Sequence, residues 1–175
     1  METQVDDQVT GAVAEVELAV DLPIEEVWAL VTDVRRTGEW SPECVHAAWR
    51  TAEEELPHVG ARFEARNEYP DGFVSTVECV VTEAVEPSVF EWVVLDDDLD
   101  VAKPGSIWRY ELAAEGGGTR VRQRFTHGPG LTGVRAFVLA HPERTRDAVA
   151  GRMAQLRANM TATLRKMTDQ RGIGR

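Results

Sequence analysis

Between about residues 43 and 127 the sequence alternates apolar and polar residues in one segment after another. The clearest segment is ARFEARNEY, in which Phe63 and Ala65 alternate with charged residues. A period of two places successive side chains on opposite faces of a strand, so each of these strands has one apolar face. The pattern therefore predicts an antiparallel sheet with one covered face, because strands buried on both faces read as continuous apolar runs.

The same alternation predicts which side chains point inward from this sheet. Most are aliphatic, but a second group combines aromatic, polar and small residues that can line a ligand site: Phe63, Asn67, Tyr69, Ser75, Val77, Trp92, Trp108, Tyr110, Gln123 and, at the end of the last strand, His127. Apolar walls with a few convergent polar groups are typical of small-molecule sites. Arg66 and Arg122 fall on the outward face.

A single helix at the C-terminal end is predicted to cover the sheet. Its apolar residues keep helical spacing for about five turns: Val149, Met153, Leu156, Met160, Leu164 and Met167. Its basic residues are expected elsewhere, on its exposed surface: Arg152, Arg157, Arg165 and Lys166. Pro142 suits the start of this helix, after an irregular stretch from about Gly128 that includes GPGLTG.

The N-terminal part is predicted to add one strand over residues 12–22 and a short helix from Pro23 to about Asp33. Gly38 and Pro42 then leave room for at most one further short turn of helix. A strand, two short helices, about six strands and a long helix form an α+β layout in one domain. Its core spans about residues 12–169, with flexible tails at 1–11 and 170–175. Because the sheet twists away from a straight helix, a space is expected at one end.

Composition and charge narrow the functional classes. The net charge is −11, and the last 45 residues carry nine Lys and Arg against three Asp and Glu. This asymmetry indicates a basic helix on an acidic sheet and no nucleic-acid binding, because the overall charge repels phosphate backbones. The sequence contains no metal-ligand spacing. GPGLTG matches the G-x-G-x-x-G pattern but lacks the following strand with an acidic residue that a dinucleotide site needs, so no cofactor is expected. Cys44 and Cys79 are expected to be reduced thiols. No export signal or membrane span is readable, which predicts a cytoplasmic protein.

Several segments resemble the START-like (SRPBCC) helix-grip superfamily, in particular its bacterial polyketide cyclase/dehydrase-like branch. These segments are PIEEVWALVTDV, with Pro23, Val27, Trp28 and Asp33 at the P-x-x-x-V-W-x-x-x-x-D positions, then GEWSPE, VGARF, WRYEL and GGTRV. The similarity covers about residues 12–169. It implies a helix-grip fold, in which a curved sheet of about seven strands wraps around the C-terminal helix and an apolar ligand lies between them.

The resemblance leaves two functions open. One is a protein that binds a small hydrophobic molecule of polyketide- or lipid-like character, with Met153 and Met160 adapting to its shape. The other is an aromatase, cyclase or dehydratase, in which Tyr69, Tyr110 and His127 are the candidate acid–base groups. Aromatase/cyclases of this superfamily combine cavity tryptophans with an inward arginine and a tyrosine, and here no inward arginine is apparent.

Two further expectations concern surfaces. The resemblance predicts that Trp28 is a core anchor and that Trp40 borders the rim of the ligand space, where a large amphipathic ring is well placed. Val13, Val93 and Ile107 interrupt otherwise polar faces. Apolar side chains on a polar face can form the contact between two copies of a chain, so the sequence allows a homodimer.

Overall fold

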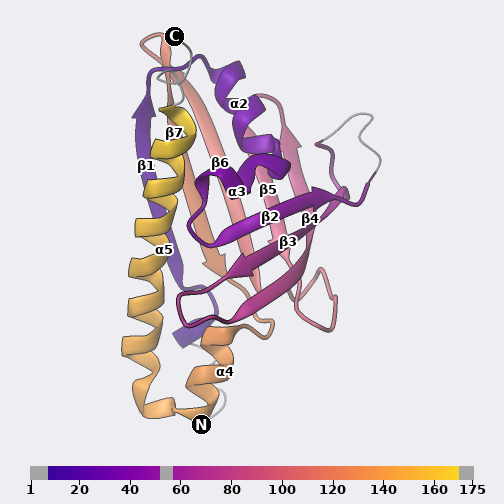
Figure 1. Ribbon diagram of the computed structural model, residues 1–175, viewed down its shortest axis with the longest axis vertical. Helices are drawn as coiled ribbons and strands as arrows, with labels where there is room; N and C mark the ends of the chain where they lie inside the picture. The colour runs from indigo at the N-terminus through magenta and orange to yellow at the C-terminus, as the bar shows by residue number, and fades with distance from the viewer. Residues whose placement is uncertain (1–7, 52–56, 170–175) are drawn as a thin grey trace.

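The computed structural model describes residues 8–51 and 57–169, and its centre is one seven-stranded antiparallel sheet (Figure 1). The strands are β1 (Val13–Val20), β2 (Cys44–Trp49), β3 (Arg62–Glu68), β4 (Val74–Val85), β5 (Val89–Val94), β6 (Ser106–Glu115) and β7 (Gly118–His127). Their spatial order is β1-β7-β6-β5-β4-β3-β2. Consecutive strands from β2 to β7 are therefore neighbours, and β1 is added at the β7 edge.

The helices lie on one face of this sheet, as Figure 1 shows. They are α2 (Ile24–Thr32), the 3-10 turn η1 (Val34–Arg36), α3 (Thr37–Trp40), α4 (Gly133–Ala140), the 3-10 turn η2 (Pro142–Arg144) and α5 (Thr145–Thr168). α5 has 24 residues and runs along β1. The predicted α+β helix-grip layout is confirmed. None of the described helices is long and apolar enough to cross a membrane.

The segment between β7 and α5 is more ordered than the sequence pattern predicted. Its residues 133–140 form α4, whose N-terminus is capped by Thr132, the side chain of which accepts a hydrogen bond from the backbone N–H of Arg135. Such a cap satisfies one of the free N–H groups at the start of a helix. Pro142 begins η2, and α5 starts three residues later, at Thr145.

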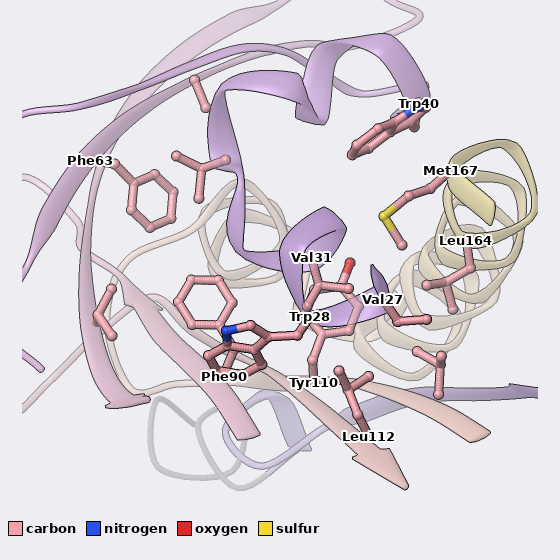
Figure 2. Packing of buried hydrophobic residues seen from close by; sticks show 14 of the residues in the cluster. Val27, Trp28, Val31, Trp40, Phe63, Phe90, Tyr110, Leu112, Leu164 and Met167 are labelled. Carbon is pink, nitrogen blue, oxygen red and sulfur yellow. The ribbon is translucent and has the colours of Figure 1, made fainter. Parts of the chain in front are cut away.

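Trp28 and Trp40 belong to the same hydrophobic core, which Figure 2 shows from close by. Trp28 is 6% exposed and meets the ring of Phe90 edge-on, with the ring centroids 6.4 Å apart. Trp40 is 4% exposed, and its ring lies beside Met167 of α5 in Figure 2. The prediction that Trp28 anchors the core agrees with this burial. Trp40 does not lie at a rim, because α5 covers it.

Gly38 allows α3 to lie directly against β2. A side chain at this position would collide with the carbonyl group of Val45. Real Cβ atoms do not approach backbone oxygen so closely, so only a residue without a Cβ fits. The glycine that the sequence pattern assigned to a turn therefore sets the distance between a helix and a strand.

The outer face of the sheet carries a ladder of ion pairs across neighbouring strands. Arg109 contacts three carboxylates, those of Glu83, Glu91 and Glu111, at 2.5, 2.9 and 2.8 Å. Arg122 is paired with Glu17 at 3.0 Å. The Arg109 contacts are partly buried, whereas the Arg122–Glu17 pair is exposed, and exposed pairs contribute little to stability. Their main effect is to keep this face polar, so that the apolar face of each strand turns toward the helices.

The three apolar residues behind the homodimer prediction differ in exposure. Val93 is 5% exposed and packs with Val80 and Leu95 in a small cluster of its own, against which Ile107 also lies. Val13 is 39% exposed. Two of the three residues therefore pack within the chain, and the homodimer remains a prediction.

The two cysteines lie inside the fold, as expected of reduced thiols. Cys79 is buried, Cys44 is partly buried, and both are free. Burial raises the pKa of the Cys44 thiol to about 11 and also raises that of Cys79. Both thiols are therefore protonated and unreactive near neutral pH.

Leu164 tests the contact between α5 and the sheet, because its side chain is completely buried. We expect Leu164→Ala to lower the free energy of unfolding by about 2–5 kcal/mol, through lost apolar contact and the cavity left behind. Arg165→Ala, on the exposed side of the same turn, should change it by less than about 0.5 kcal/mol. Urea denaturation followed by circular dichroism measures both, and equal effects would contradict this packing.

Candidate functional site

The inner face of the sheet carries a continuous row of aromatic side chains. The rings of Trp92 and Trp108 are nearly parallel, with planes 3° apart and centroids 6.1 Å apart. Phe63 lies 6.1 Å from Trp92 at one end, and Phe125 meets Trp108 edge-on at 5.1 Å at the other. We call these four residues the aromatic wall. Both tryptophans face inward yet remain partly exposed, so the side chains of the described residues do not fully cover the wall.

The aromatic wall crosses a division in the hydrophobic core. The main cluster contains Tyr110 and residues of α2 and α3, and Trp92 packs against it. A second cluster contains Phe125 with residues from the middle of α5, and Trp108 packs against that one. Val16 touches both clusters. We call the boundary, lined by Val16, Trp92, Trp108, Tyr110 and Gln123, the seam.

Two polar residues lie at the seam. Tyr110 of β6 and Gln123 of β7 are directly opposed in the strand register and are only 6% and 5% exposed. Gln123 Oε1 is buried and has no hydrogen-bond partner among residues 8–51 and 57–169. Burial raises the pKa of the Tyr110 hydroxyl, so this group is neutral at physiological pH.

The β3–β4 end of the inner face carries another small polar pair. Asn67 Nδ2 donates to Ser75 Oγ at 3.4 Å, and both residues are partly buried. Val77, the next inward residue of β4, packs against the main cluster. The predicted ligand-binding residues of β3 and β4 thus share one face with the aromatic wall.

A charged cluster joins α5 to the loop before β2. Arg152 donates two hydrogen bonds to the Glu43 carboxylate, at 2.6 and 2.8 Å, and Asn159 Nδ2 donates to the same carboxylate at 3.2 Å. The guanidinium carbon of Arg152 lies 5.8 Å from the centre of the Tyr69 ring. Burial by itself lowers the pKa of Arg152, but hydrogen bonds and charge from Glu43 outweigh it and leave this pKa raised. We call these four residues the Glu43 cluster.

The prediction that Arg152 lies on the exposed surface was wrong, because its side chain is only 19% exposed. The sequence did contain a signal. Arg152 and Asn159 precede Met153 and Met160 and are seven residues apart, which places both on one edge of the apolar stripe. The expectation that Arg66 and Arg122 point outward agrees with their side-chain exposures of 51% and 42%.

Glu43 could not be identified from the sequence because its partners lie more than 100 positions away. Its orientation comes from the preceding turn, where Ser41 Oγ accepts hydrogen bonds from the backbone N–H groups of Glu43 and Cys44 at 3.2 and 2.9 Å. Serine commonly stabilises turns in this way. The turn directs the carboxylate toward α5.

The three predicted acid–base residues lie in three different environments. Tyr69 belongs to the Glu43 cluster, Tyr110 lies at the seam, and His127 lies at the end of β7. Both ring nitrogens of His127 are engaged: Nδ1 with the Gly128 carbonyl at 2.8 Å and Nε2 with the Thr132 hydroxyl at 2.7 Å. Burial lowers the pKa of His127. This histidine therefore ties β7 to the start of α4.

The other predicted ligand-binding residues, Met153, Met160 and Trp40, lie in the hydrophobic core. Met153 and Met160 are 5% and 2% exposed and pack in the second cluster beside Phe125. Trp40 lies in the main cluster, and its Nε1 is buried without a partner among the described residues. This burial differs from the predicted position of Trp40 at the rim of a ligand space.

A groove of about 500 Å³ lies on another part of the molecule. It runs between α2 and the end of α5 and is lined by Leu22, Glu26, Ala29, Leu30, Asp33, Arg36, Met167 and Thr168. None of the predicted ligand-binding residues lines it. The groove and the aromatic wall are therefore separate features.

Comparison with known proteins identifies relatives of this arrangement. A family model described as polyketide cyclase / dehydrase and lipid transport matches residues 12–161. No curated protein matches the chain. The solved structure of the Polyketide_cyc-like protein Cgl2372 from Corynebacterium glutamicum is 28% identical, with a TM-score of 0.63 over 91% of this chain and 90% of that one.

Two larger solved structures show the same fold. The di-domain ARO/CYC StfQ of the steffimycin biosynthetic pathway has a TM-score of 0.72 at 16% identity. The di-domain ARO/CYC BexL of the BE-7585A pathway has a TM-score of 0.71 at 20% identity. Each alignment covers 96% of this chain but only 52% of the other. The chain therefore spans about half the length of these two proteins.

The Glu43–Arg152 pair should be more strongly coupled than an exposed pair, because both side chains are largely removed from water. In a double-mutant cycle with Glu43→Ala and Arg152→Ala, we expect a coupling energy of about 1–3 kcal/mol. The matched control is the exposed pair Arg66–Glu68, which lies 3.0 Å apart and should give about 0.2–1 kcal/mol. Urea denaturation measures both cycles, and equal coupling would contradict the burial of the Glu43 cluster.

His127 should make stability depend on pH. Because its folded-state pKa is lowered, the unfolded chain binds the proton more readily, so its stabilisation is complete above about pH 6.5 and is lost as pH falls below it. We expect His127→Gln to flatten the fall in unfolding free energy between about pH 7 and pH 5. The exposed His58 provides the control His58→Gln, which should keep the wild-type slope. An unchanged slope in His127→Gln would rule out this assignment.

Proposed function

Because the chain belongs to the polyketide cyclase/dehydrase and lipid transport family, we propose that it binds a small hydrophobic molecule of polyketide- or lipid-like character against the aromatic wall. The observation that carries this proposal is the pair of parallel tryptophans, Trp92 and Trp108, which face inward and are only partly covered. Water against such ring faces is unfavourable, and a hydrophobic ligand that displaces it gains free energy.

The surroundings of the wall favour a ligand of variable shape. Met153 and Met160 of α5 face the wall from the second cluster, and flexible thioethers conform to different apolar surfaces. Asn67, Ser75 and Gln123 supply polar groups on the same inner face of the sheet. An apolar surface with a few polar groups at its margins is the usual composition of a small-molecule site.

A second candidate function is catalysis by an aromatase, cyclase or dehydratase, and the position of Tyr69 beside Arg152 favours it. A guanidinium group can polarise a ketone carbonyl, and a phenol can deliver or accept the proton. Arg152 already donates two hydrogen bonds to Glu43. In this alternative, substrate binding would have to share or replace that pairing.

Native mass spectrometry of freshly purified protein tests the proposal. We expect a retained small molecule whose occupancy falls in Trp108→Ala, because loss of one aromatic contact costs roughly threefold to tenfold in affinity. Val85→Ala, at the exposed end of β4, should leave the occupancy unchanged. Thermal unfolding by circular dichroism shows whether each variant is folded.

The small molecule that the purified protein retains also distinguishes the two functions. A carrier releases the compound that it was loaded with. An enzyme returns a different compound, which has lost one water for a dehydratase or aromatase and is an isomer of equal mass, separated by chromatography, for a cyclase that only closes the ring. Tyr69→Phe slows that change. A folded protein that retains nothing, and binds neither fatty acids nor polycyclic aromatics in equilibrium dialysis, would contradict both.

A further inference from the structure

The groove of about 500 Å³ between α2 and the end of α5 is formed largely by one side of α2. Four of its lining residues, Glu26, Ala29, Leu30 and Asp33, are spaced at i, i+3, i+4 and i+7, which places them on one side of a helix. The core residue Trp28 lies on the opposite side of α2. In Figure 1, α2 and the C-terminal end of α5 lie at the same end of the molecule.

The floor of this groove is apolar. Leu22 and Met167 line it and are only 6% and 1% exposed, so they form its deepest part. Leu30 is partly buried beside them, and Ala29 is exposed and has too small a side chain to fill the space. A hydrocarbon chain that covers this floor gains free energy because apolar surface is removed from water.

Two carboxylates border the apolar floor, one toward each end of α2. The seven residues from Glu26 to Asp33 span about 10 Å at roughly 1.5 Å per residue. Glu26 is exposed and forms no ion pair within residues 8–51 and 57–169. Asp33 is paired with Arg35 at 2.9 Å, but a carboxylate has about four acceptor positions and can accept further hydrogen bonds. The groove therefore offers an acceptor for a positively charged group on either side of its floor.

The positive charge of Arg36, which also lines the groove, is offset by a neighbour. Its guanidinium group donates hydrogen bonds to Glu39 at 3.0 and 2.9 Å and lies 4.8 Å from the centre of the Trp40 ring. Thr168 lines the groove as the last residue of α5, and the C-terminal end of a helix carries the negative end of its dipole. The groove therefore favours a cation over an anion.

We propose that this groove binds a linear aliphatic diamine or polyamine, with one ammonium group at Glu26, another at Asp33 and the hydrocarbon chain on the apolar floor between them. An ammonium group has three hydrogen-bond donors and no acceptor, which suits a carboxylate. A metal ion fits less well, because the described residues contain no group of three or more His, Cys, Asp or Glu side chains that could hold one. A fatty acid would place its carboxylate beside two others, and like charges repel.

NMR titration of the ¹⁵N-labelled protein with three probes tests this proposal: 1,8-diaminooctane, 1,4-diaminobutane and 8-amino-1-octanol. The two nitrogens of the extended molecule are about 11 Å apart in 1,8-diaminooctane and about 6 Å apart in 1,4-diaminobutane. The third probe keeps the long chain but has one ammonium group. We expect 1,8-diaminooctane to bind roughly 2- to 5-fold more tightly than 8-amino-1-octanol, as one exposed ion pair predicts. 1,4-Diaminobutane should bind more weakly than 1,8-diaminooctane, because it cannot reach both carboxylates.

Three variants show whether the two carboxylates cause this preference. Glu26→Gln and Asp33→Asn should each abolish the preference for 1,8-diaminooctane over 8-amino-1-octanol. Glu25→Gln removes the same charge from an exposed position of α2 that does not line the groove, so it should keep the preference. Circular dichroism shows whether each variant is folded before its affinity is compared.

Four results would overturn the proposal. They are no binding of 1,8-diaminooctane to the wild-type protein, equal affinities for the three probes, an equal loss of preference in Glu25→Gln, and chemical-shift changes confined to residues outside α2 and the end of α5. An equal loss in Glu25→Gln would indicate nonspecific attraction of cations to the acidic surface. Each of these results leaves the proposed function intact, because none of the residues tested here contributes to the aromatic wall.

Discussion

The contact between the apolar stripe of α5 and the single apolar face of the sheet supports every other feature of this protein. The stripe reaches from Met153 to Met167 and contributes to both core clusters. The apolar face of the sheet is unfavourable in water unless other elements cover it. Burial of apolar surface is the dominant favourable contribution to the free energy of folding. Because the outer face carries ion pairs such as those of Arg109, α5, α2 and α3 cover the other face.

This contact also explains why the interior is divided. The sheet twists, whereas α5 is straight, so their surfaces do not match along their full length. Trp28, Trp40 and Leu164 fill the main cluster on one side, while Met153, Leu156 and Met160 fill the second cluster on the other. The aromatic wall crosses the boundary between them. Its partial exposure is therefore a result of the architecture, and the wall is where the proposed ligand replaces missing protein contacts.

The Glu43 cluster shows how a polar site can be placed at the edge of such a core. Arg152 and Asn159 belong to α5 and Glu43 to the loop before β2, so the cluster holds this loop against the helix. Ion pairs that are shielded from water are costly unless their hydrogen bonds are satisfied. Glu43 meets this condition because its carboxylate accepts three hydrogen bonds, two from Arg152 and one from Asn159. The cluster therefore places the charged groups of Arg152 and Glu43 beside the apolar core, and neither charge is left unpaired.

The alternation of residues and the helical spacing by themselves determined most of the secondary structure, the inward side of every strand except β2 and the covering role of α5, because these depend on local periodicity. The aromatic composition of the wall, with Phe63, Trp92 and Trp108, was likewise predictable. Only the tertiary structure decided that Arg152 meets Glu43, that His127 is tied to Thr132, and that Trp40 is covered by α5. These relations join residues from separate elements, and their distances depend on how α5 packs against the twisted sheet, which no local pattern specifies.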